Sequence, residues 1–133
     1  MLDERRADLC NYRMKNSEDS LTAAEDCLEK GLYRDAINRS YYAAFYAIKA
    51  LLALEEVDFK RHKDVVAYFN RTYAATEKIP REIGRKLARL QQKREKSDYD
   101  DFYIASKEET MEQIENTKSV ILAVKDYLSR MEN

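Results

Sequence analysis

The stretch RDAINRSYYAAFYAIKALLALE, residues 34–55, is the most informative part of the chain about its architecture, because it is apolar on nearly every side. At 100° per residue, one helical face carries large side chains and another carries only alanines. The large face comprises Ile37, Tyr41, Ala44, Phe45, Ile48 and Leu52, and the small face comprises Ala43, Ala47 and Ala50. A helix that is apolar all round has to be covered by neighbouring elements. The stretch therefore predicts a central, buried helix with an alanine face that a neighbour can approach closely.

The composition of the whole chain favours an all-α fold. Its 133 residues include only two glycines and one proline, and 37% of them are charged. So few turn-forming residues argue for long helices and against a β-rich structure. A chain of this length is expected to form one domain, residues 1–133, with a sizeable core.

Five helices are expected along the chain, at about residues 2–30, 34–55, 60–76, 78–96 and from 106 onward. Gly31 is expected to follow the last turn of the first helix, and Asp58 to cap the third. Ser106 and Glu109 have the spacing of a capping box for the fifth helix, after a polar loop over 97–105. Apolar spacings of three and four along the fifth helix are typical of an antiparallel bundle. The sequence thus predicts an up-and-down four-helix bundle with an additional short helix.

Several classes of protein are disfavoured by what the sequence lacks. The apolar run 41–54 is interrupted by Lys49 and is too short to cross a bilayer. Nothing resembles a signal peptide, and Cys10 and Cys27 have no metal-type spacing, so free thiols in a reducing cytoplasm are expected. One histidine excludes the paired Glu-x-x-His pattern of a di-iron bundle. With no glycine-rich phosphate loop, zinc spacing or nucleophile elbow, no metal or cofactor is expected.

The net charge is only −1, but basic and acidic residues are unevenly distributed. Residues 78–96 contain eight basic and two acidic side chains, whereas residues 98–115 contain seven acidic and one basic. One interpretation is that the two segments neutralise each other across an antiparallel helix pair. The net charge by itself predicts neither nucleic-acid binding nor membrane binding.

Arg94 departs from the charge pattern of the fourth expected helix. It continues an apolar face whose earlier members are Ile79, Ile83, Leu87 and Leu90. Six other basic residues fall on the other side: Lys78, Arg81, Arg85, Arg89, Lys93 and Lys96. A guanidinium that points toward a packed side must be paired, or must line a cleft where an anion binds.

Two further groups of residues are candidates for function. One is a column on the far side of the central helix, formed by Arg39, Tyr42, Tyr46 and Lys49. It suits an anion-binding wall, unless its two cations pair with carboxylates of the first or fifth helix. The other is His62, in the first turn of the third helix, which is either a general acid or base or an ordinary residue near a helix start.

The segment REKSDYDDFY, residues 94–103, gathers a guanidinium, three aspartates and two tyrosines at a helix end and in the loop beyond it. Arg94 can bridge Asp98, or the terminal carbonyls of its own helix, as a structural clasp. The same groups can instead hold a phosphodiester, with Arg94 on the phosphate and Tyr99 or Tyr103 stacking on a base or donating a proton. The spacing alone leaves both interpretations open.

Three motifs together resemble the HEPN superfamily, and more narrowly its small, stand-alone bacterial and archaeal branch. They are Arg39-Ser-Tyr-Tyr-Ala-Ala-Phe-Tyr, Lys60-Arg-His-Lys and Arg94-x-x-x-Asp-Tyr, which occur in this order on the expected helices. The resemblance covers essentially the whole chain. It implies an up-and-down helical bundle that is commonly a homodimer. It also implies frequent pairing with a minimal nucleotidyltransferase in a two-gene, toxin–antitoxin-like module.

Catalytic HEPN proteins are metal-independent ribonucleases, with an arginine followed after four to six residues by a histidine. Carried over, the arginine is Arg94, but Tyr99 stands after four intervening residues and no histidine follows His62. The resemblance therefore implies a degenerate ribonuclease motif in a binding module for a nucleotidyltransferase, RNA or both. Tyr99 or Tyr103 is then the residue that the partner modifies.

Two alternatives stay open at this point. In the first, the protein is an active ribonuclease in which Arg94 clamps the phosphate with help from Arg39 and Lys49. Asp98, Tyr99 or His62 then handle the protons, although a phenol with a pKa near 10 is a poor base at neutral pH. In the second, the chain is a purely structural homodimer.

Overall fold

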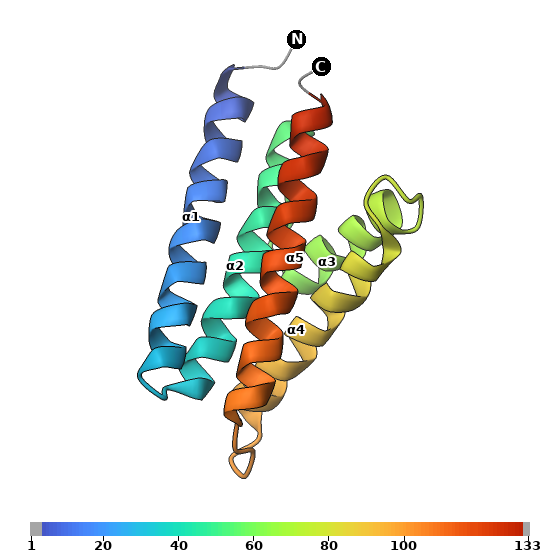
Figure 1. Ribbon diagram of the computed structural model, residues 1–133. Helices are drawn as coiled ribbons and strands as arrows, with labels where there is room; N and C mark the ends of the chain where they lie inside the picture. Colours follow the sequence, from blue (N-terminus) through green and yellow to red (C-terminus); the bar gives the residue numbers. More distant parts are fainter. Residues whose placement is uncertain (1–3, 132–133) are drawn as a thin grey trace.

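The computed structural model describes residues 4–131, which form helices joined by loops and turns and contain no strand (Figure 1). The elements are α1 (Glu4–Glu29), α2 (Tyr33–Leu54), α3 (His62–Phe69), the π-helical turn η1 (Asn70–Ala74), α4 (Arg81–Tyr99) and α5 (Lys107–Met131). Four long helices run up and down, and α3 is the additional short one (Figure 1). The all-α bundle predicted from the sequence is confirmed.

The central position of α2 is also confirmed. It contacts α1, α3, α4 and α5, and most of its residues are buried. Its large face joins the main core, whose fully buried members include Tyr41, Ile48, Leu52, Val65, Phe69, Leu87 and Leu90. The alanine face lies against α1, where Ser17 Oγ donates a hydrogen bond of 2.5 Å to the carbonyl of Ala43. Small side chains therefore allow the two backbones to approach closely.

The turn between α1 and α2 depends on a left-handed glycine, as predicted. Gly31 has a φ of +77°, and its N–H donates to the carbonyl of Leu28 at 3.0 Å. The N–H of Leu32 reaches back to the carbonyl of Cys27 at 2.8 Å. These two bonds satisfy carbonyl groups at the end of α1 in the pattern of a Schellman motif.

Gly31→Ala is expected to lower the free energy of unfolding by about 1 kcal/mol, because the left-handed region is strained for a residue with a Cβ. Space is not the cause, since a Cβ at this position would meet nothing within 4 Å. Urea denaturation followed by circular dichroism measures the difference. Lys30→Ala, at the neighbouring exposed position, is the matched control. An equal loss in both variants would contradict the backbone explanation.

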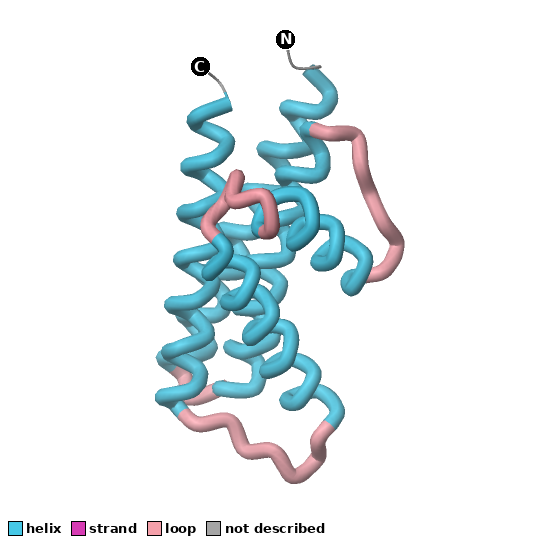
Figure 2. Tube along the Cα trace, turned by 90° about the vertical axis from the view of Figure 1, so that its right-hand side faces the viewer, coloured by secondary structure: helices cyan, strands magenta, loops and turns pink. Residues whose placement is uncertain are grey.

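The prediction that Asp58 caps the third helix is wrong. That helix begins at His62, and its N-cap residue is Arg61, which makes no side-chain capping bond. The Asp58 carboxylate instead binds Lys49 Nζ at 2.7 Å and lies 3.5 Å from Arg13 Nη2. The same carboxylate accepts the N–H of the next residue, Phe59, at 2.9 Å, so its hydrogen bonds are made outside the helix, and the two cations strengthen this arrangement. They hold the connection between α2 and α3, which Figure 2 shows as a long loop, to α2 and α1.

The fourth helix is shifted from its predicted range and ends later. It begins at Arg81, directly after Pro80, and continues to Tyr99. Part of the predicted loop 97–105 is therefore helical, and Ser97 is fully buried. As a consequence, Asp98 lies one turn from Arg94 on the same helix instead of in a loop.

The contact between α4 and α5 bears out the charge pattern of the sequence. Lys93 Nζ lies 3.5 Å from Glu109 Oε1, and Arg89 Nη1 lies 3.8 Å from Glu112 Oε1. Ser106 caps α5 as predicted, since its Oγ accepts the Glu109 N–H at 3.0 Å. The reciprocal half of the capping box is not formed, because the Glu109 carboxylate is engaged by Lys93 and by the Tyr103 hydroxyl.

Candidate functional site

Three helices bring the candidate residues together at one side of the bundle. Tyr41, Tyr42 and Phe45 come from the middle of α2, His62 from the first turn of α3, and Arg94 and Asp98 from the last turns of α4. Figure 2 shows the first turn of α3 and the C-terminal half of α4 on the same side of the molecule. We call these six residues the Arg94 site, and Tyr41 with Tyr42 the tyrosine pair.

Arg94 rests on the tyrosine pair. Its guanidinium carbon lies 5.1 Å from the ring centroid of Tyr41 and 5.4 Å from that of Tyr42, which are cation–π distances. Nη2 donates a hydrogen bond to the Tyr42 hydroxyl at 3.4 Å. Nε lies 3.3 Å from Asp98 Oδ2, close enough for an ion pair but not aligned for a hydrogen bond. The guanidinium is thus fixed in orientation while its side chain stays 19% exposed.

His62 contacts the same tyrosines. Its ring stacks on Phe45 with centroids 4.1 Å apart and meets the ring of Tyr42 edge-on at 5.7 Å. Nδ1 lies 3.2 Å from the Tyr41 hydroxyl, within hydrogen-bonding distance. The sequence left open whether the third and fourth helices place their functional residues near each other. In the structure, His62 and Arg94 share the tyrosine pair.

The electrostatics of the Arg94 site keep the imidazole uncharged near neutral pH. Burial lowers the pKa of His62, and the nearby charges of Arg94 and Lys49 lower it further. Burial raises the pKa of Tyr41 to about 12, although Arg94 acts in the opposite direction. Two neutral groups therefore share one hydrogen bond. If Tyr41 donates to Nδ1, the outer nitrogen Nε2 carries the remaining proton, and if Nδ1 donates, Nε2 is free to accept one.

The lowered pKa of His62 predicts a pH dependence of stability. Between the folded-state pKa and the unfolded-state value of about 6.5, the unfolded chain binds more protons, so the free energy of unfolding rises with pH in that window and is level above it. Titration of the single histidine by NMR and urea denaturation across this window measure both quantities. His62→Asn is expected to remove this component of the slope. An unchanged slope in that variant would assign the dependence to carboxylates.

The column of Arg39, Tyr42, Tyr46 and Lys49 forms only part of the wall that was predicted from the sequence. The rings of Tyr42 and Tyr46 lie side by side with centroids 6.1 Å apart. Lys49 is paired, as one interpretation of the sequence held, but its carboxylate comes from Asp58 in the α2–α3 connection and not from the first or fifth helix. Arg39 is exposed and forms no ion pair with any residue in the range 4–131.

Tyr99 and Tyr103 lie outside the Arg94 site. Tyr99 is 77% exposed, and its side chain makes no hydrogen bond or ring contact within the described part of the chain. Tyr103 donates a hydrogen bond to Glu109, and burial together with this bond raises its pKa to about 12. Lys96 Nζ lies 5.2 Å above its ring. The two tyrosines therefore differ strongly in accessibility.

Tyr41 has a part in the Arg94 site that was not predicted from the sequence. Its helical position predicts a place on the core face of the central helix, which is correct for the ring, since Tyr41 is 0% exposed. The hydroxyl, however, meets His62, and the ring supports Arg94. The sequence contained a sign of this role, because a tyrosine on a buried face needs a hydrogen-bond partner for its hydroxyl.

Residues 4–131 contain no group of three or more histidine, cysteine or acidic side chains arranged to hold a metal ion. None of the helices in this range combines the length and apolar character that crossing a membrane requires.

The fold and site define a small helical bundle that brings an arginine, a histidine and two tyrosines together. The HEPN domain model matches residues 10–127, so this chain belongs to the HEPN family. The resemblance stated from the three sequence motifs is confirmed.

Individual relatives agree with this assignment. A Thermotoga maritima protein named "UPF0332 protein" is 28% identical over 90% of this chain and 91% of its own length. A Methanocaldococcus jannaschii protein named "Putative toxin" is 36% identical over 83 residues, which are 62% of each chain. The crystal structure of an archaeal HEPN homologue shares the fold, with a TM-score of 0.71 and 21% identity over 88% of this chain and 95% of that chain.

Proposed function

We propose that this protein is the HEPN component of a two-gene, toxin–antitoxin-like module, and that its Arg94 site binds the phosphate backbone of RNA. The whole chain acts as one HEPN-like domain in this proposal, and as a cytoplasmic homodimer. The observation that carries it is the guanidinium held on the tyrosine pair beside an uncharged histidine. The name of the M. jannaschii relative supports the class of module.

The chemistry of the Arg94 site suits a phosphodiester. Stacking on two rings holds the guanidinium plane in place, so little conformational entropy is lost when an anion binds to its edge. Without RNA, Asp98 Oδ2 lies 3.3 Å from Arg94 Nε and partly neutralises the charge of the guanidinium. A phosphate oxygen replaces that carboxylate in the proposed complex, because Asp98, with 29% of its side chain exposed, can turn into solvent. Charge-assisted bonds to phosphate then compensate for the lost ion pair.

RNA binding is tested with a fluorescently labelled single-stranded RNA and anisotropy at several salt concentrations. The affinity is expected to fall as salt increases, because counterions are released when basic groups neutralise phosphates. The column residues Arg39 and Lys49 contribute to this slope as secondary phosphate contacts. No binding even at low salt would overturn the RNA part of the proposal.

A minimal nucleotidyltransferase is the proposed partner, and Tyr99 is its proposed target. Tyr99 is 77% exposed, whereas the Tyr103 hydroxyl is engaged by Glu109. Incubation with the partner and ATP, followed by peptide mass spectrometry, is expected to find a nucleotide adduct on Tyr99. The adduct should be absent from Tyr99→Phe and retained in Tyr103→Phe. An adduct on neither tyrosine would contradict this part of the proposal.

A second candidate function is metal-independent RNA cleavage. The observation that favours it is that His62 and Arg94 contact the same tyrosine pair. His62 would take the proton of a 2′-hydroxyl, and the 2′-oxygen would attack phosphorus to form a 2′,3′-cyclic phosphate. The bond to the 5′-oxygen would break while Arg94 stabilises the charge, and that oxygen would take up a proton from water to leave as a 5′-hydroxyl. Incubation of cellular RNA with wild type, His62→Ala and Arg94→Ala in a chelator distinguishes the two. Binding without cleavage would leave the degenerate-motif proposal, and neither activity would leave a structural homodimer.

A further inference from the structure

A second group of positive charges lies along α2 from the Arg94 site. Tyr41, Phe45 and Lys49 follow one another at intervals of four residues, so they form a row with about 5.4 Å between successive turns. Arg94 rests on the first member of this row, and His62 stacks on the second. Burial and the charge of Arg94 lower the pKa of His62, and the charge of Lys49 lowers it further. The row therefore ends in a cation that is close enough to act on the Arg94 site.

Arg13 of α1 joins Lys49 at the end of the row. Its Nη1 donates a hydrogen bond of 2.9 Å to the Lys49 carbonyl, which holds the guanidinium beside α2. The side chains of Arg13 and Lys49 are only 15% and 18% exposed. Cations that are so largely buried are costly unless an anion lies close to them. We call Arg13 and Lys49 the cation pair.

The anion that the cation pair holds is a carboxylate of the same chain. Asp58 Oδ1 accepts a hydrogen bond of 2.7 Å from Lys49 Nζ, and Oδ2 lies 3.5 Å from Arg13 Nη2. Burial acts to raise the pKa of Asp58, but the hydrogen bonds from Lys49 and from the Phe59 N–H, with the two nearby positive charges, outweigh it and lower that pKa. Each carboxylate oxygen thus meets a different cation, which is also how two oxygens of a phosphate can be bound.

Asp58 can leave the cation pair while the α2–α3 connection stays in place. Its side chain is 55% exposed, so it can turn into solvent. The residues on either side of it, Val57 and Phe59, pack against the main core and hold the connection. The Arg94 site has the same arrangement, because the partly exposed carboxylate of Asp98 lies on a mostly buried guanidinium.

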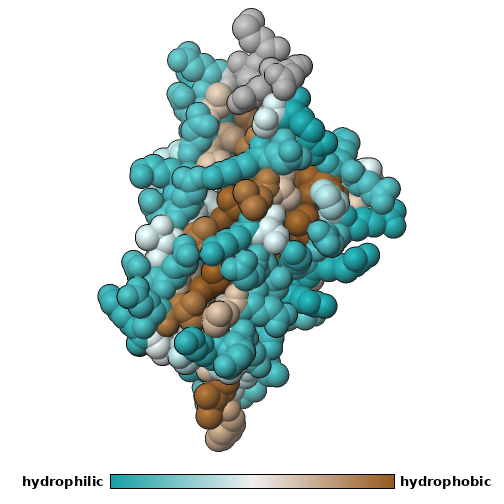
Figure 3. All heavy atoms as spheres, viewed as in Figure 1, coloured by the Kyte–Doolittle hydropathy of each residue, from teal (hydrophilic) through white to brown (hydrophobic). Residues whose placement is uncertain are grey.

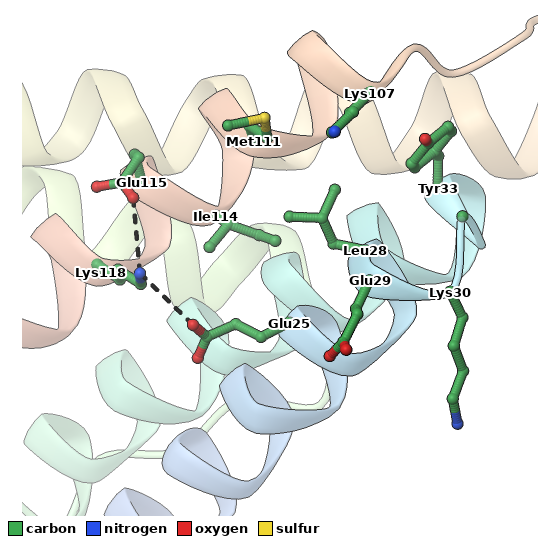
Figure 4. A pocket seen from close by; sticks show the side chains of 11 residues that line it. Glu25, Leu28, Glu29, Lys30, Tyr33, Lys107, Met111, Ile114, Glu115 and Lys118 are labelled. Atoms are coloured by element: carbon green, nitrogen blue, oxygen red, sulfur yellow. Dashed lines mark ion pairs between the residues drawn. The ribbon is translucent and has the colours of Figure 1, made fainter.

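Other places on the surface are less suited to a phosphate backbone. Figure 3 shows a strip of apolar atoms along the face in which α1 and α5 lie. A hollow of about 750 Å³ at the start of α2 contains lysines, but Figure 4 shows Lys118 between Glu25 and Glu115, each 3.6 Å away. Glu29 also lines this hollow. Its cations are balanced by several carboxylates on helices, whereas the cation pair meets one carboxylate on a loop.

We propose that the cation pair is a second phosphate-binding site for RNA, and that Asp58 is an internal competitor that occupies this site until RNA binds. The inference rests on the proposed binding of RNA at the Arg94 site and adds a second contact with its own control. A single strand that follows the row on α2 places one phosphate on Arg94 and a later one on the cation pair. Each phosphate displaces a carboxylate of the chain, so RNA binds more weakly than the cations alone would allow.

Asp58→Asn is expected to raise the affinity for single-stranded RNA at least about threefold, because RNA no longer competes with an ion pair. Asp58→Ser, which removes the carboxylate in a different way, should give the same gain. The anisotropy assay at fixed salt measures both, and circular dichroism checks that the variants fold.

Asp126→Asn is the matched control for this gain. Asp126 forms an exposed ion pair with Arg130 at 3.2 Å on α5, so the variant removes the same charge outside the row. It should raise the affinity clearly less than Asp58→Asn does. Equal gains in the two variants, or no gain in Asp58→Asn while wild type binds RNA, would overturn the inference and leave the proposed function standing.

Lys49→Gln distinguishes a competitor from a merely structural ion pair. In wild type this substitution removes a phosphate contact together with the competing ion pair, so the affinity should fall only slightly. In the Asp58→Asn background it removes the contact alone and should cancel the gain. An equal fall in both backgrounds would show that Asp58 does not compete for Lys49.

The same assay separates failure of this inference from failure of the proposed function. Absence of RNA binding by wild type and by Asp58→Asn would overturn both. Binding by Asp58→Asn alone would show that the carboxylate blocks the site completely, as a strong internal competitor does.

Discussion

Arg94→Met is expected to lower the affinity for single-stranded RNA by about ten- to a hundredfold, because one charge-assisted contact to phosphate is worth about 1.5–3 kcal/mol. Methionine keeps an unbranched apolar stem over the tyrosine pair, so the fold is retained while the charge is removed. The anisotropy assay at fixed salt measures the loss. Because Asp98 is partly exposed, its carboxylate can be hydrated when its partner is missing.

Arg85→Met is the matched control for this result. Arg85 is exposed on the same helix and outside the Arg94 site, so the variant removes an equal charge. The general electrostatic attraction of the protein for RNA changes equally in both variants, and only Arg94 contributes an oriented contact. If both variants weaken binding by the same factor, the Arg94 site has no special part in RNA recognition.

Phe69→Ala is expected to lower the free energy of unfolding by about 3–5 kcal/mol, because it leaves a cavity in the core. Phe69 is fully buried and stacks on Tyr73 with ring centroids 5.8 Å apart. It also anchors α3, which has only eight residues. A helix this short is not stable by its own hydrogen bonds and depends on its buried face. Urea denaturation measures the loss.

The same variant is expected to disturb the Arg94 site from a distance. Loosening α3 exposes its first turn, so the pKa of His62 should rise toward its ordinary value of about 6.5. NMR titration of the single histidine follows this change. Leu122→Ala, at a 66% exposed position, should alter stability by no more than about 0.5 kcal/mol and leave the titration unchanged. A destabilised Phe69→Ala protein with an unchanged His62 titration would show that the site does not depend on the anchoring of α3.

The elements that could be predicted from the sequence are those set by neighbours along the chain. The apolar character of residues 34–55 identified the central helix, and Gly31 identified the first turn. Both depend on helical periodicity or on one residue's backbone conformation. The charge pairing of α4 with α5 was also predictable, because two oppositely charged segments joined by a short loop must lie antiparallel.

Connections and partners of individual side chains were less predictable. Asp58 has the chemistry of a helix cap, yet it binds Lys49 and Arg13, and Arg13 is 45 residues away in sequence. Local propensity cannot predict whether a carboxylate binds the amides of a helix start or a cation that only the packed bundle brings close. The end of α4 was also misplaced, because residues 97–99 are polar in sequence and yet remain helical, with Ser97 fully buried.

By itself, the sequence determined the all-α class, the number and order of the main helices, the burial of the central one and the unusual position of Arg94. The periodic apolar patterns of these helices indicate which face of each helix is buried. Only the tertiary structure brought His62 and Arg94 to the same tyrosine pair. Such relations join residues far apart in the chain, and they depend on how helices cross and how loops return, which no local pattern encodes.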